Sequence, residues 1–147
     1  MLEPLSIAAA AAALATSLLR CIDSLHTIQQ RISTVDHSFH NLQTELTSLQ
    51  KQVHTVESPS LSKQFQRSEY QYLWTDFDHA VRECKRMIGG LERQLGRIAR
   101  IKGGMLGARK VKKALGIWWR GVEIEMILKE IRIYRRSMKM SLQFIAV

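Results

Sequence analysis

Apolar residues recur along most of this chain at alternating steps of four and three, which is the period of one face of an α-helix. The clearest case lies between residues 35 and 56, where the apolar positions are Val35, Phe39, Leu42, Leu46, Leu49, Val53 and Val56. The positions between them are mainly polar, so the segment predicts a helix over 35–56 with a heptad seam. Pro59 disfavours helical geometry at the preceding residue and so separates this helix from the next.

A longer segment repeats the same pattern between residues 63 and 101. Its apolar positions are Tyr70, Trp74, Phe77, Val81, Cys84, Ile88, Leu91, Leu95 and Ile98. They predict a second helix with a continuous buried face. Two adjacent glycines, Gly89 and Gly90, fall inside it, and they predict a kink or a close contact with a neighbouring helix.

The opening segment, residues 4–32, predicts a third helix. Pro4 suits the first turn, Ala8–Ala13 favours helix strongly, and the later apolar residues are periodic. A helix that is apolar on every face belongs in a core or in a membrane, and the residues of this helix that would face either are Leu5, Ile7, Leu14 and Leu18. The uncharged run from Leu5 to Leu19 has 15 residues, fewer than the about 20 of a membrane span. We therefore expect a core helix, with a membrane role as the alternative.

The last part of the chain combines glycine, positive charge and a final apolar face. Residues 101–116 hold four glycines, five basic residues and no acid, which predicts a mobile loop, with a short helix over 108–115 left open. A last helix is expected over 117–145, with an inward face made of Trp118, Val122, Ile124, Ile127, Ile131, Tyr134, Met138, Leu142 and Ile145. Four long helices with short connections predict an all-α, antiparallel four-helix bundle, with 1–147 as a single domain.

Charge is distributed unevenly along the chain. The formal net charge is +9, yet residues 1–62 hold three basic and five acidic side chains, so the excess lies in the second half. The stretch from Arg97 to Arg120 contains no acid. Its candidate anion or lipid contacts are Arg97, Arg100, Lys102, Arg109, Lys110, Lys112, Lys113, Arg120 and the interfacial Trp119. A solvated loop, an anionic membrane surface and a nucleic acid are the three interpretations.

No pattern indicates catalysis. The glycines at 103, 104 and 107 lack the spacing of a nucleotide-binding loop. His37 and His40 lie one turn apart, without further ligands at metal spacing, so we expect no metal, no cofactor and no enzyme. Cys21 and Cys84 each fall in an apolar stripe, which predicts buried, reduced thiols and a cytoplasmic setting.

Three segments of the chain resemble one family. They are the opening MLEPLSIAAAAAAL, the central HAVRECKRMIGGLERQL and the closing VEIEMILKEIRIYRRSMKMSLQFI. The family is the fungal N-terminal helical domain that precedes STAND (NLR-like) NTPases, which includes the N-terminal domain of azaphilone pigment cluster protein L. The positions that match are Pro4 to Ala8, Cys84, Leu91, Trp118, Glu123 to Glu125, Tyr134 and Ser137. Leu2 is an extra residue in the opening.

The resemblance implies a signalling or oligomerisation module, in a family whose longer members continue into an NTPase or repeat region. Related HeLo-like domains imply a second role, a membrane-active cell-death effector that uses its N-terminal helix together with the basic loop. A basic nucleic-acid-binding bundle is the third hypothesis. We expect protein partners or self-association first, an anionic membrane surface second, and no small-molecule substrate.

Overall fold

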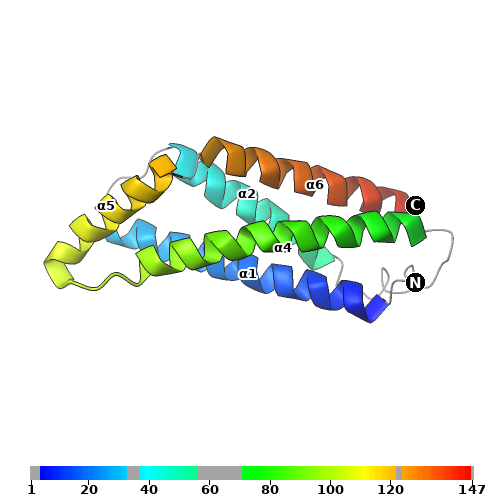
Figure 1. Ribbon diagram of the computed structural model, residues 1–147, viewed down its shortest axis with the longest axis horizontal. Coiled ribbons are helices and arrows are strands. Elements are labelled where there is room, and N and C mark those ends of the chain that lie inside the picture. The colour runs from blue at the N-terminus through cyan, green and yellow to red at the C-terminus, as the bar shows by residue number, and fades with distance from the viewer. Residues whose placement is uncertain (1–3, 33–36, 56–70, 122–123, 147) are drawn as a thin grey trace.

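The computed structural model describes residues 4–32, 37–55, 71–121 and 124–146. Within these residues every regular element is a helix, and the molecule is elongated (Figure 1). The helices are α1 (Pro4–Arg31), α2 (His37–His54), α4 (Gln71–Ala99), α5 (Gly104–Gly121) and α6 (Ile124–Ala146). The predicted all-α class is therefore confirmed.

The bounds of the first three helices agree with the predicted ranges to within two residues at the ends that the structure describes. The helix predicted over 4–32 ends at Arg31, and the one predicted over 35–56 is described from His37 to His54. The helix predicted over 63–101 is described from Gln71 to Ala99, and residues 63–70 lie outside the described ranges. Gly89 and Gly90 lie within an uninterrupted α4. A Cβ added at either would meet nothing within 4 Å, so the predicted close contact at these glycines is wrong.

The predicted loop over 101–116 is wrong from Gly104 onward, and the short helix left open over 108–115 lies within α5. Only residues 100–103 separate α4 from α5, and α5 begins at Gly104 and continues through both tryptophans. The expected last helix over 117–145 is thus two helices, because the chain leaves α5 after Gly121 and starts α6 at Ile124. Glycine is a poor helix former, but α5 has an apolar face at Val111 and Trp118 that packs on the other helices, and this packing outweighs the propensity.

The core lies mainly between α1, α2, α4 and α6. α1 packs most extensively against α4 and next against α2, while α6 contacts both α4 and α2. The predicted seams are buried: Leu42, Leu46 and Leu49 of α2 are fully enclosed, as are Phe77, Val81 and Cys84 of α4. The inward face of α6 includes Ile131 and Met138 as predicted, and also Leu128, which the prediction missed. α5 packs mainly on α4 and α1, and these contacts are less extensive than those among α1, α2, α4 and α6.

The relative direction of α1 and α4 follows from three contacts between them. Ser6 bonds to Arg82, Arg20 to Glu92, and Arg31 to the carbonyl of Ala99. Sequence number increases along both helices together, so the most extensively packed pair is parallel. α1 and α2 are antiparallel, as are α4 and α6 (Figure 1). The structure therefore combines parallel and antiparallel pairs of packed helices, and it does not show a bundle in which every packed pair is antiparallel.

Candidate functional site

The link between α4 and α5 orients the basic segment. Gly103 has a φ of +146°, a backbone conformation that favours glycine because it has no Cβ. The Gly103 carbonyl accepts hydrogen bonds from the backbone N–H groups of Leu106 at 3.0 Å and Gly107 at 3.1 Å. These bonds form the first turn of α5, so the turn at Gly103 fixes where the helix starts and how it leaves α4.

Arg31, the last residue of α1, joins three helices. Its Nη1 donates to the carbonyl of Ala99 at the end of α4, at 3.2 Å. That carbonyl has no partner within its own helix, and a cation is favourable at a helix C-terminus. Gly107 of α5 is buried beside the same guanidinium, since a Cβ added there would lie 2.6 Å from Arg31 Nη2. An arginine and a glycine therefore hold α5 against the ends of α1 and α4.

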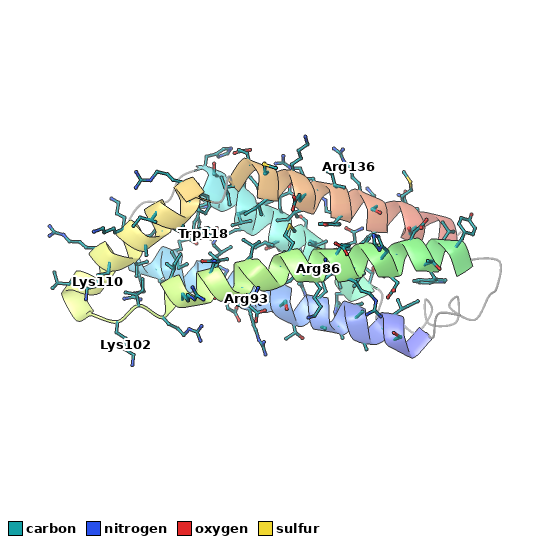
Figure 2. All side chains as sticks on the ribbon, in the orientation of Figure 1. Arg86, Arg93, Lys102, Lys110, Trp118 and Arg136 are labelled. Carbon is teal, nitrogen blue, oxygen red and sulfur yellow. The ribbon has the colours of Figure 1, made fainter. Side chains whose placement is uncertain are left out.

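The predicted basic contacts gather at this end of the molecule. Arg97 lies on the last turn of α4, Arg100 and Lys102 lie on the link, and all three are exposed. The remaining predicted cations are exposed on α5: Arg109, Lys110, Lys112, Lys113 and Arg120. Figure 2 shows Lys102 and Lys110 at the end of the molecule where α4 joins α5, away from Arg136 on α6. The cations that the sequence analysis placed in a loop thus lie together on α5, on the link before it and on the last turn of α4.

Two apolar side chains, which sequence reasoning did not select, share the outer face of α5. Leu106 is 62% exposed and Ile117 is 59% exposed. The helical period places both on the same side as Lys113 and Arg120. A segment interpreted as a loop has no faces, and for that reason the pattern was not recognised. The outer face of α5 (Leu106, Arg109, Lys110, Lys113, Ile117 and Arg120) is therefore basic and amphipathic.

Trp119 occupies a different environment from these cations. It is partly buried, stacked on Phe39 of α2 with ring centroids 6.0 Å apart. The ring of Trp118 lies edge-on to that of Trp119, with the ring centroids 5.3 Å apart, and Trp118 is itself buried. Trp118 therefore belongs to the core, as predicted for the inward face. Trp119 anchors α5 to α2, and it does not extend into solvent as a lipid-contacting side chain would.

A second surface feature is an open groove between α4 and α6, with a volume of about 540 Å³. Its α4 side includes Asp76, His79 and Glu83, and its α6 side includes Ile133 and Met140. Both α6 residues are more than half exposed. We call this feature the acidic groove.

The electrostatic environment of the acidic groove is visible in Tyr134, which lines it. Burial raises the pKa of this phenol, and the carboxylates of Glu130 and Glu83 raise it further, while Arg86 lowers it. Negative charge next to a phenol disfavours the phenolate. The exposed apolar side chains of the groove therefore lie near the carboxylates of Glu83 and Glu130, and Arg86, 3.7 Å from Glu83, offsets part of this negative charge.

The predicted core or membrane positions of α1 lie inside the molecule where they are described. Ile7, Leu14 and Leu18 are buried, whereas the side chain of Leu5 lies outside the described set. By length and composition, Ser6–Arg31 qualifies as a candidate membrane span, with a mean hydropathy of 1.4, and 39% of its most apolar window is buried among the other helices. Core helices of soluble proteins pass the same test, so the finding is weak evidence for a membrane.

Cys21 and Cys84 are both buried, as predicted. Burial raises the pKa of each thiol to about 12, and Glu92 adds to the effect at Cys21. At neutral pH both are neutral thiols and poor nucleophiles. Among the described residues, no three His, Cys, Asp or Glu side chains are grouped so that they could hold a metal ion.

No known protein family, no curated protein and no solved structure matches this chain. The resemblance to the fungal STAND N-terminal domain gains no support from these comparisons and stays a prediction.

Proposed function

We propose that this chain is a non-enzymatic, cytoplasmic signalling or oligomerisation domain of the fungal STAND N-terminal type, and that it acts through contacts with protein. In this proposal α1, α2, α4 and α6 form one four-helix bundle, with antiparallel neighbours in sequence, and α5 is an appendage. The bundle provides a rigid body, and its surface features provide the contacts.

The observation that supports protein contact is a stripe of exposed apolar residues on α6. Met126, Ile133 and Met140 are 56%, 53% and 62% exposed, and they are spaced seven residues apart. This spacing places them on one side of the helix, as in the seam of a coiled coil. Single exposed apolar residues are ordinary, whereas an aligned set marks an interaction surface.

The test is whether the chain self-associates through this stripe. Sedimentation velocity over a concentration series should show reversible association of the wild type, weakened in a variant with Met126→Ser, Ile133→Ser and Met140→Ser. Leu19→Ser is the matched control, because Leu19 is 48% exposed on α1, on a different helix from the stripe. A wild-type chain that stays monomeric throughout would remove self-association from the proposal.

A membrane-active effector is the second candidate, and the outer face of α5 favours it. A basic helix with exposed Leu106 and Ile117 has the composition of helices that lie on anionic membranes. Replacing Arg109, Lys110, Lys112 and Lys113 by glutamine should abolish flotation with phosphatidylserine vesicles at low salt and leave the helical content unchanged. The matched control neutralises Lys51, Arg93, Lys129 and Lys139, which are exposed on other helices. Binding that survives in the α5 variant would contradict this candidate.

A further inference from the structure

The outer face of α5 and the acidic groove are chemically complementary. α5 carries five Lys or Arg residues and no acid, with exposed Leu106 and Ile117 among them. The groove offers Asp76 and Glu83 on one wall and exposed Ile133 and Met140 on the other. Basic residues and apolar side chains on one surface thus correspond to acidic residues and apolar side chains on the other.

The spacing of the charges also matches. Asp76 and Glu83 are seven residues apart on α4, which is two helical turns or about 10 Å. Lys113 and Arg120 are separated by the same interval on α5, and both are exposed. A helix laid along the groove can therefore bring both cations opposite both carboxylates at once. Ile133 and Met140 have the same spacing on the opposite wall. On α5, Ile117 lies between Lys113 and Arg120 and can contact that wall, whereas Leu106 is eleven residues from Ile117 and lies outside this repeat.

The two surfaces lie towards opposite ends of the molecule. In Figure 1, α5 extends from the end where α1 and α4 finish, while the first half of α4 and the last half of α6 lie towards the other end. α5 is held in place by Arg31 and by the Phe39–Trp119 stack. The groove is thus out of reach of the α5 of the same chain, and a second copy can present its own α5 to it.

We propose that the acidic groove of one copy binds the α5 of a second copy, with Lys113 and Arg120 opposite Asp76 and Glu83. This inference rests on the proposed self-association and names the surfaces that carry it. The contact is heterologous, because two different patches meet, so one copy of the pair keeps a free α5 and the other keeps a free groove. Repetition of such a contact gives a ring or an open filament rather than a closed twofold dimer. The interface is one helix in one groove, so the assembly should be weak and sensitive to salt.

A charge-exchange experiment tests this contact with the full chain. One variant carries Lys113→Glu and Arg120→Glu, and the other carries Asp76→Lys and Glu83→Lys. Each variant alone meets like charge at its interface, which should weaken self-association about tenfold or more. Mixing the two restores opposite charges at both types of contact, so the mixture should assemble. Sedimentation velocity measures association, and circular dichroism confirms that each variant is folded.

The controls separate this inference from the proposed function. Lys51→Glu with Arg93→Glu reverses two exposed charges outside both surfaces and should leave association unchanged. If the wild type associates and both charge variants associate equally well, the α5–groove contact is wrong while self-association stands. A different outcome is that the wild type stays monomeric and binds phosphatidylserine vesicles, while the variant with Lys113→Glu and Arg120→Glu does not bind them. In that case α5 is a membrane surface and the inference is overturned. Recovery in the mixture supports the contact directly, because unfolding or a general charge effect would not produce it.

Discussion

At the scale of single residues, the two cysteines show how burial changes chemistry. Cys21 lies at the contact between α1 and α4, with its Sγ 3.7 Å from the carbonyl oxygen of Ile88. Cys84 is enclosed on α4. Their apolar surroundings oppose a thiolate and raise both pKa values from 9.0 to about 12. These side chains therefore act as small core residues, and they couple the stability of the fold to alkaline pH.

We expect the stability contributed by the two thiols to be complete below pH 9.0 and to be lost as the pH rises through about 12. The sign follows because the unfolded chain ionises first and is stabilised by doing so. A shift from 9.0 to about 12 corresponds to about 4 kcal/mol for each thiol. Urea unfolding across this pH range measures the loss. The Cys21→Ala and Cys84→Ala double variant should lose stability less steeply, and equal slopes would contradict the assignment.

At the scale of elements, three helices could be predicted from sequence because their apolar period is regular. The seam of α2 and that of α4 are buried at every predicted position that the structure describes. α5 could not be predicted in this way. Its buried positions are Gly107, Val111 and Trp118, and glycine contributes no apolar signal. Gly107 is buried because Arg31, distant in sequence, lies against it, and such a contact leaves no local pattern.

The candidate site was predictable in composition but not in shape. The basic residues from Arg97 to Arg120 were identified from the sequence, and the structure places them together at one end. Their arrangement as one amphipathic face depends on α5 being a helix. The acidic groove combines Asp76 and Glu83 with Ile133 and Met140, and residues so far apart meet only because α4 packs against α6.

Glycine substitutions distinguish the turn from the helix interior. Gly103→Ala should destabilise the chain by about 1–2 kcal/mol, because alanine is strained at a φ of +146°. Gly90→Ala is the matched control, since the added Cβ meets nothing within 4 Å in α4, and it should stabilise the chain by up to about 1 kcal/mol. Urea unfolding measures both changes. A stabilising Gly103→Ala would show that the link does not hold the conformation described.

At the scale of the whole molecule, stability depends on the seams that join α1, α2, α4 and α6. Leu46 of α2 and Val81 of α4 are both fully buried. Leu46→Asp and Val81→Asp should each unfold the chain, because an unpaired buried charge costs several kcal/mol against a total stability of about 5–15 kcal/mol. Thr44→Asp is the control at an exposed position of α2. Circular dichroism measures thermal unfolding of each variant. A core variant that melts at the wild-type temperature would refute the assigned register.

The position of α1 leads to a prediction about the whole chain. α1 packs on both α4 and α2, with Ala11, Leu14 and Leu18 fully enclosed. Removing residues 1–22 would expose the apolar seams that these side chains cover, and it would also break the Arg20–Glu92 and Ser6–Arg82 contacts. Exposed seams of that length associate with one another in water.

We therefore expect the full chain to be soluble without detergent and the chain that lacks residues 1–22 to aggregate. Light scattering after centrifugation measures both. The matched control keeps α1 and changes Ala9→Ser and Ala12→Ser on its exposed face, which should leave the chain soluble. A truncated chain that stays soluble and fully helical would show that α1 is dispensable for folding. A helix that is apolar, long enough to span a membrane and not needed by the core would be free to act in a membrane, and that result would favour the membrane-effector candidate.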